Sequence, residues 1–217
     1  MSVSYEDFFP LILPEIAGAP EALVVNAIRN SCIEFCEKSL ILTRDHDPIT
    51  VIKSVIDYDL EPPSGYVIYK IMRAWLDSTE LTPMTPKVVR DSAVYNQNYS
   101  TYVESKTTPQ YYLQKDETTI TLWGVPENDY QNGLTLRVVL KPSRASTSVE
   151  DVLFENYAES IAHGALYRLM LAVGRPYSNP QAAAIYNGLY RSAINSARLI
   201  SEYGHVRAAI SASLRKI

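Results

Sequence analysis

Residues 148–203, SVEDVLFENYAESIAHGALYRLMLAVGRPYSNPQAAAIYNGLYRSAINSARLISEY, contain two successive runs in which apolar side chains recur at helical spacing. The first run predicts a helix over 148–173, because its apolar residues fall on one face. Ser148 followed by Asp151 is typical of a capping box at a helix start, and Gly174 is typical of a helix end. This face consists of Leu153, Tyr157, Ile161, Ala165, Leu169 and Ala172.

The second run predicts a helix over 180–203. Asn179 is a favourable N-cap residue, and Pro180 fits the first position of a helix because it has no N–H to leave unpaired. Gly204 marks the end of this run. Each apolar face needs a partner to bury it, so we expect the helices over 148–173 and 180–203 to pack together.

The N-terminal part of the chain also has apolar residues at helical spacing. Residues 19–39 carry a third apolar stripe, and Pro20 fits the first turn of a helix there. A shorter helical stretch is expected at 4–13. We expect the stripe of 19–39 to be buried against the two C-terminal helices.

The middle of the chain changes to strand spacing, with Val, Ile, Thr and Tyr runs separated by Pro, Gly, Asp and Asn. The segment VPENDYQNG, residues 125–133, is rich in turn residues and ends in Asn132-Gly133, which predicts the tip of a β-hairpin between the last two strands. Residues 92–109 are polar and predict an exposed loop. The predicted strands are 49–57, 66–76, 85–91, 110–115, 118–124 and 134–141.

These elements predict an α+β fold. Residues 1–42 and 143–204 are expected to form a helical bundle from the N- and C-terminal helices. Residues 43–142 are expected to form a β-rich insertion lobe, and residues 205–217 to form a C-terminal docking tail.

Composition excludes several classes of protein. The chain has 217 residues with 47% hydrophobic and 20% charged residues, which is ordinary for a globular protein. No apolar run approaches the ~20 residues that a membrane-spanning helix needs. The acidic, proline-interrupted start does not resemble a secretory signal. We therefore expect a protein that is made and kept in a cytoplasm or released by lysis, with no membrane contact.

Charge is unevenly distributed along the chain. The formal net charge is −4, but residues 1–61 sum to −7 and residues 160–217 to +6. Opposite charges of this kind can pair within a fold or between neighbouring copies. They can also mark a nucleic-acid surface, although overall acidity argues against tight DNA binding. The 16 tyrosines suit either buried partner surfaces or a tyrosine-rich β-region.

Residue types that perform chemistry are sparse. Cys32 and Cys36 are four residues apart, but a structural zinc site needs four ligands, so we interpret them as core residues. His163 borders an apolar helix face, which favours a packed histidine. We expect no enzyme activity, no metal and no cofactor.

Two other functions remain open from the residues alone. A hydrolase could use the acids Asp45, Asp47, Asp57, Asp59 and Glu61, although a solvated face or charged docking surface explains them as well. A carbohydrate-binding module could use the β-lobe aromatics. These aromatics are Trp75, Trp123 and the tyrosines within 95–112.

Two stretches resemble a known family. LPEIAGAPEALVVNAIRNSCIEFCEKS (13–39) and the region from KPSRAS to INSA (141–197), on either side of a β-rich middle, are similar to head-to-tail adaptor (connector) proteins of tailed bacteriophages. Tyr177 stands where members of that family often have Trp. The resemblance is weak over 43–135.

The resemblance implies a structural virion protein of the neck, between the capsid portal and the tail. Such adaptors form a ring homo-oligomer, usually a dodecamer, beneath the portal protein. They help to retain packaged DNA and contact tail or nozzle proteins. Double-stranded DNA passes through the lumen during genome packaging and ejection without sequence-specific binding.

Two partner-binding segments are expected. Residues 205–217 could extend the preceding helix, fray as a tail, or order against a partner groove. We favour the last, with the portal as the partner that the resemblance implies, because an apolar and a basic side suit a helix-in-groove contact. Glu127, Asp129 and Tyr130 are expected to contact a tail protein or a neighbouring subunit. The portal-binding residues would be Val206, Arg207, Ile210, Leu214, Arg215, Lys216 and Ile217.

Overall fold

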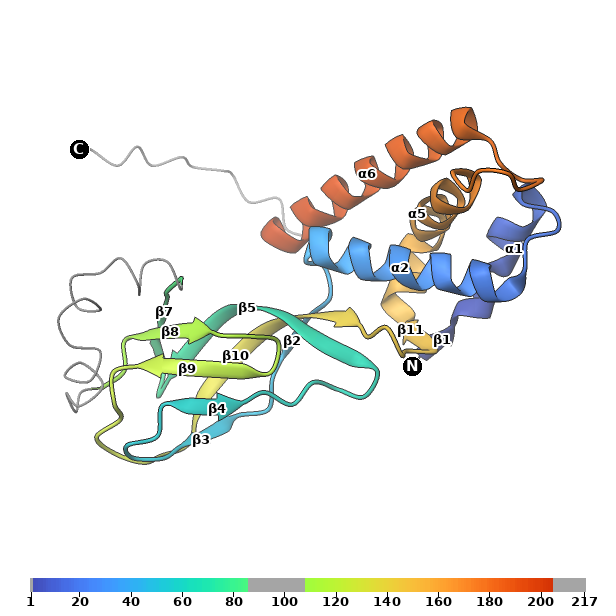
Figure 1. Cartoon of the computed structure of the whole chain (residues 1–217). Helices are drawn as coiled ribbons and strands as arrows, with labels where there is room; N and C mark the ends of the chain where they lie inside the picture. Colours follow the sequence, from blue (N-terminus) through green and yellow to red (C-terminus); the bar gives the residue numbers. More distant parts are fainter. Residues whose placement is uncertain (1, 86–107, 205–217) are drawn as a thin grey trace, which may run out of the picture. The chain divides into compact units, whose positions relative to one another are not determined.

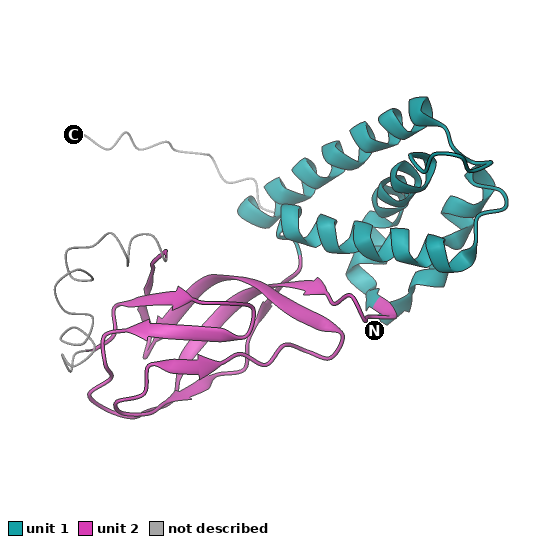
Figure 2. Ribbon diagram, in the orientation of Figure 1, with its two compact units in different colours: residues 1–41, 149–217 teal, residues 42–148 magenta. Residues whose placement is uncertain are grey.

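The structure, a computed structural model, describes residues 2–85 and 108–204 and separates into two compact units (Figure 2). Unit 1 consists of residues 1–41 and 149–217, and unit 2 of residues 42–148. Unit 1 is mainly helical and unit 2 is built from strands, which confirms the predicted mixed α+β composition. None of the described helices combines the length and apolarity needed to cross a membrane.

The described part of unit 1 is dominated by long helices that pack on one another. Each of α2 (Glu21–Ser39), α5 (Asp151–Met170) and α6 (Pro180–Tyr203) contacts the other two (Figure 1). These elements confirm the helices predicted at 19–39, 148–173 and 180–203 to within three residues at each end.

The ends of the helices differ in part from the sequence prediction. The Asn179 side chain accepts a hydrogen bond from the Ala182 N–H at 3.1 Å, which confirms it as the N-cap of α6. The capping box predicted at Ser148 is wrong. Ser148 lies in a short strand, and Glu150 precedes α5 without a side-chain cap. A hydroxyl that begins a strand is not placed to accept from the first helical N–H groups.

The three helices meet around the ring of Tyr190, which is 1% exposed. Its hydroxyl, on α6, donates a hydrogen bond to the Ser31 carbonyl of α2 at 2.6 Å. Gly164 of α5 lies under the ring, where an added Cβ would stand 2.7 Å from Tyr190 Cε2. Phe35 of α2 packs beside the same ring, with centroids 6.2 Å apart.

The N-terminal segment completes unit 1 with a strand and short helical turns. The stretch predicted at 4–13 is a succession of such turns rather than one helix. Ser4 caps the first of them, because its Oγ accepts from the Glu6 N–H at 3.3 Å while its own N–H donates to Asp7 Oδ2 at 3.0 Å. The elements are β1 (Ser2–Ser4), which pairs with β11 (Ser148–Glu150), then η1 (Tyr5–Phe8), α1 (Phe9–Ile12) and η2 (Leu13–Glu15).

Unit 2 contains two sheets in the described residues. In the first, the order is β2-β10-β5-β6, with β3 also paired to β10; in the second it is β4-β9-β8-β7. The strands are β2 (Thr43–Asp45), β3 (Ile49–Val51), β4 (Asp57–Asp59), β5 (Tyr66–Leu76), β6 (Thr79–Glu80), β7 (Thr82–Pro83), β8 (Tyr111–Gln114), β9 (Thr119–Trp123) and β10 (Tyr130–Pro142).

Strand β10 organises the first sheet. It pairs antiparallel with β5 along most of its length and with β2 and β3 on its other side. Beside β2, the Leu140 N–H donates to the Leu42 carbonyl at 2.8 Å. The first residue of unit 2 and a residue near its C-terminal end therefore lie side by side.

The predicted hairpin between the last two strands is wrong. β9 pairs with β8 and β4, whereas β10 belongs to the other sheet. Asn132 adopts a positive φ of 51°, but inside β10, where the register shifts between Tyr130 and Leu134. A Cβ on Gly133 would stand 2.5 Å from Tyr130 Cβ. The Asn-Gly pair thus builds a β-bulge instead of a hairpin turn.

The remaining strand predictions have mixed outcomes. The strand predicted at 66–76 is confirmed as β5 with the same bounds. The stretch 49–57 splits into β3 and the start of β4, because a turn with Ser54 at φ 66° separates them. All but the first residue of the strand predicted at 85–91, and residues 92–107 of the predicted loop, lie outside the described residues.

Candidate functional site

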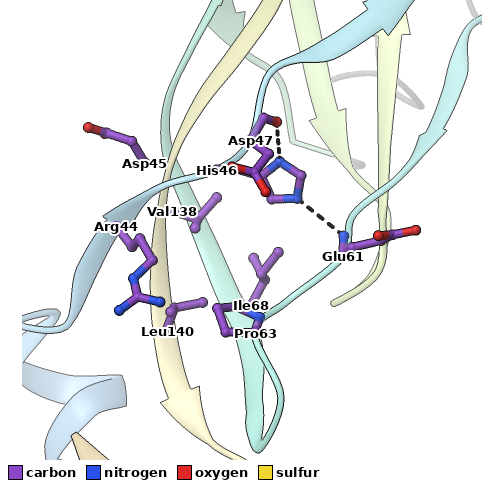
Figure 3. A pocket seen from close by; sticks show the side chains of 9 residues that line it. All are labelled: Arg44, Asp45, His46, Asp47, Glu61, Pro63, Ile68, Val138 and Leu140. Atoms are coloured by element: carbon purple, nitrogen blue, oxygen red, sulfur yellow. Dashed lines mark hydrogen bonds between the residues drawn. The ribbon is translucent and has the colours of Figure 1, made fainter. Parts of the chain in front are cut away.

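A hollow with a volume of about 140 Å³ lies in unit 2 (Figure 3). Strand β2, the segment that follows it and the segment between β4 and β5 supply its polar side, and β5 and β10 supply an apolar side. It is lined by Arg44, Asp45, His46, Asp47, Glu61, Pro63, Ile68, Val138 and Leu140.

His46 holds the polar side of this hollow together. Its Nε2 accepts from the Glu61 N–H at 3.2 Å, so the neutral ring carries its proton on Nδ1. Nδ1 lies 2.7 Å from the Asp47 carbonyl and donates to it. Both ring nitrogens are therefore used in structural hydrogen bonds, and neither is available as a general base.

The five acids of the hydrolase hypothesis do not converge on one site. Asp45, Asp47 and Glu61 line the hollow, and Asp59 lines an adjoining depression with Asp47 and Glu61. Asp57 lies elsewhere. In residues 2–85 and 108–204, no three His, Cys, Asp or Glu side chains are grouped to hold a metal ion.

The contacts of Asp57 hold neighbouring strands together. Lys115 Nζ lies 2.9 Å from its Oδ1, and the buried Thr121 hydroxyl donates to the same oxygen. Burial alone would raise the pKa of Asp57, but the hydrogen bonds from Thr121 and Lys115 and the lysine charge hold it below the ordinary value. This carboxylate joins β4 to β9 and to the turn after β8.

The four described aromatics of the carbohydrate hypothesis are half-buried or buried, which does not suit an open carbohydrate groove. Trp75 and Trp123 are half-buried and lie in different sheets. Tyr111 is half-buried and Tyr112 is buried. None of the four lines either hollow. The tyrosines between 95 and 107 lie outside the described residues.

Cys32, Cys36 and His163 lie in the packed interior of unit 1 or at its edge. Both thiols are fully buried, and burial raises the pKa of each. A buried thiol with a raised pKa is inert toward metals and oxidants at neutral pH. His163 stacks on Tyr186 with ring centroids 5.4 Å apart.

Glu127 and Asp129 lie in the loop between β9 and β10, and Tyr130 is the first residue of β10. The turn between β3 and β4 and the loop between β9 and β10 are linked by hydrogen bonds. The Lys53 N–H donates to Asp129 Oδ1 at 2.6 Å, and the Ser54 N–H donates to the Pro126 carbonyl at 3.0 Å. We call residues 52–55 and 126–129 the loop pair.

The loop pair is also held from inside. The Tyr58 hydroxyl donates to the Val55 carbonyl at 2.7 Å and accepts from the Ile52 N–H at 3.2 Å. Burial raises the pKa of Tyr58, so the phenol keeps the proton that it donates. Ile52 and Val55 nevertheless expose 54% and 39% of their surface. A braced backbone that presents branched apolar side chains is suited to binding, because little conformational freedom is lost on contact.

The contact residues predicted from the sequence lie in or next to only one of the two loops of the loop pair. Glu127 and Asp129 are exposed, whereas Tyr130 begins β10 and pairs with Val51. Ile52 and Val55 were missed, because they resemble ordinary strand residues and only the fold shows them exposed. The portal-binding residues predicted within 205–217 lie outside the described residues.

Comparison with known families accounts for almost the whole chain. The sequence model of the SU10 adaptor protein family matches residues 12–213, which include α2, unit 2, α5 and α6. No curated protein matches the chain. Adaptors of this kind are structural proteins of the virion neck and contact the portal and the tail. The chain belongs to the SU10 adaptor protein family and is a structural head-to-tail adaptor of a phage.

Proposed function

We propose that copies of the chain form a ring of twelve, as is usual for adaptors of this kind. The ring docks under the portal, helps to retain packaged DNA and connects to the tail. The observation that carries the proposal is the family match over residues 12–213. The loop pair adds a braced, partly apolar surface of the kind that a partner protein covers.

The helical unit is proposed as the body of the ring, with α2, α5 and α6 as a bundle. A ring needs two different faces of each copy to match. The charge difference between residues 1–61 and 160–217 supplies opposite signs for such a contact. The overall net charge of −4 favours a lumen through which DNA slides without strong phosphate contacts.

Residues 205–217 are proposed to dock on the portal. Their sequence places Val206, Ile210 and Leu214 at helical spacing, and it contains basic residues but no acid. Thirteen residues are too few for a stable isolated helix, because nucleation outweighs the few bonds that form. Affinity should therefore depend on the apolar side chains that a portal groove buries.

Deletion of 205–217 tests the portal contact. We expect the truncated chain to keep its circular dichroism and thermal melting, and to bind the portal protein of the same phage at least tenfold more weakly. Leu214→Asp should approach the deletion. The control Arg215→Ala should change mainly the salt dependence and the rate of association. Portal binding of the truncated chain at wild-type affinity would show that the contact lies elsewhere.

A second experiment tests the loop pair as a contact for a tail protein or neighbouring copy. Ile52→Ser removes the exposed apolar group, and the matched control Ile52→Val keeps a branched apolar side chain. We expect the serine variant to melt like the wild type but to form fewer complete necks, counted by negative-stain imaging. Equal numbers of complete necks for both variants would exclude Ile52 from the contact.

A further inference from the structure

Helix α6 carries an apolar row on the side that unit 1 does not bury. Its buried residues include Ala183, Tyr190, Ile194 and Ala197. On the opposite side, Ile185, Leu189, Leu199 and Tyr203 expose 66%, 48%, 57% and 48% of their surface. The exposed Ser192 and Ser196 lie between these two pairs, so that the six residues follow one another at alternating spacings of four and three and share one face of the helix. We call Ile185, Leu189, Ser192, Ser196, Leu199 and Tyr203 the α6 stripe.

The α6 stripe has the form of a helix–helix contact. It runs from Ile185 to Tyr203, or about 27 Å at the helical rise of about 1.5 Å per residue. Single exposed apolar residues are normal, but two apolar pairs aligned on one helix face are typical of a binding surface. The serines in its middle leave room for close approach of a second backbone.

Basic side chains border the α6 stripe on one side. Arg191 and Arg198 are exposed, and they are seven residues apart, which places them on one edge of the helix. Arg198 is paired with Glu202 at 3.0 Å, whereas Arg191 forms no ion pair within the described part of the chain. The surface that covers the stripe should therefore combine apolar and acidic groups.

Unit 1 itself has such a surface at the start of α5. Val152, Glu155, Asn156 and Glu159 are exposed and follow i, i+3, i+4, i+7 spacing, so they share one face. We call these four residues the acidic face. The first turns of α5 pack on η1, where Phe154 meets Phe8 with centroids 5.0 Å apart. The later residues His163 and Gly164 meet α6.

We infer that the α6 stripe of one copy packs against the acidic face of the next copy. The inference rests on the proposed ring, in which each copy offers two different faces. The stripe is apolar and has arginines on one side, and the acidic face begins with the apolar Val152 and carries two carboxylates. DNA would match the arginines but not the apolar row, because DNA contacts are mainly with phosphates.

Charge reversal with a mixing control tests this contact. We expect Arg191→Glu and Glu155→Arg each to weaken self-association of the full chain at least tenfold in sedimentation velocity. An equal mixture of the two variants should associate like the wild type, because every contact then joins a glutamate to an arginine. If the single variants associate normally, or if the mixture stays as weak as each variant alone, the inference is wrong.

A second pair of variants separates the apolar row from apolar surface in general. Leu189→Ser should weaken self-association at least tenfold. Leu23→Ser, at a residue that is 40% exposed and lies outside both faces, should have no effect. Equal effects would refute the assignment of the stripe. A wild-type chain that binds the portal but never self-associates would overturn this inference and leave portal docking standing.

Discussion

Gly164→Ala should destabilise unit 1, although alanine is ordinarily the better helix former by about 1 kcal/mol. The new Cβ would stand 2.7 Å from Tyr190 Cε2 and 2.9 Å from Cδ2 and Cζ. Carbon atoms in contact prefer about 3.5–4.0 Å, so the ring or the helix has to move by nearly 1 Å. The ring has no easy movement, because it is 1% exposed and its hydroxyl is bound to the Ser31 carbonyl.

The magnitude follows from these opposing effects. Overpacking a closed core costs about 1–3 kcal/mol. Weakening the Tyr190 hydrogen bond adds about 0.5–1.5 kcal/mol. Subtracting the gain of about 1 kcal/mol in helix propensity leaves a net loss of about 2 kcal/mol in the free energy of unfolding.

Gly188→Ala is the matched control. Gly188 lies in the same helical unit, on α6, and a Cβ there would meet nothing within 4 Å. This variant should gain about 0.5–1 kcal/mol. Urea unfolding followed by far-UV circular dichroism, a signal that the helices dominate, measures both. A Gly164→Ala variant as stable as Gly188→Ala would refute the close packing around Tyr190.

Further predictions concern titration and burial. Burial lowers the pKa of His163 in the folded chain, so the unfolded chain takes up a proton first as the pH falls. The free energy of unfolding therefore decreases as the pH drops below 6.5, the ordinary pKa of histidine. His163→Gln should remove this pH dependence from urea midpoints measured between about pH 8 and about pH 5. The pKa of Asp57 is lowered, so its stabilising effect is present above 3.8 and is lost as the pH falls through the folded-state value; Asp57→Asn should flatten the acid limb of thermal melts. Phe35→Asp should cost about 3 kcal/mol or more by placing a charge in a closed core, and an unchanged melting temperature would contradict the burial of this side chain.

The helices and one long strand could be predicted from local spacing. The apolar stripes of 19–39, 148–173 and 180–203 are properties of single segments, and strand 66–76 is bounded by turn residues on both sides. Partners of strands are not local. β9 is followed by a good turn sequence, but its neighbours in the sheet are β8 and β4. Asn132 does adopt the positive φ that an Asn-Gly pair favours, but it does so in a bulge inside β10 and not in a hairpin turn.

The candidate contact surfaces were less accessible to sequence reasoning. Glu127 and Asp129 could be predicted as candidates from the sequence, because acids in a turn are conspicuous. Ile52, Val55, Ile185 and Leu189 look like core residues in the sequence, and only their exposure in the folded chain distinguishes them. Exposure depends on which face a distant segment covers, and residue types alone do not contain that information.

The meeting of Leu42 and Leu140 inside unit 2 bears on the order in which the chain folds. α2 and α5 are separated by more than a hundred residues, and closing a flexible loop of that length costs about 4 kcal/mol in chain entropy. In the folded chain, pairing of β2 with β10 holds residues near the two ends of this loop side by side. We therefore expect packing of α2 against α5 to be faster in a chain whose unit 2 has already folded, whereas α5 and α6, which are neighbours in the sequence, do not depend on this closure.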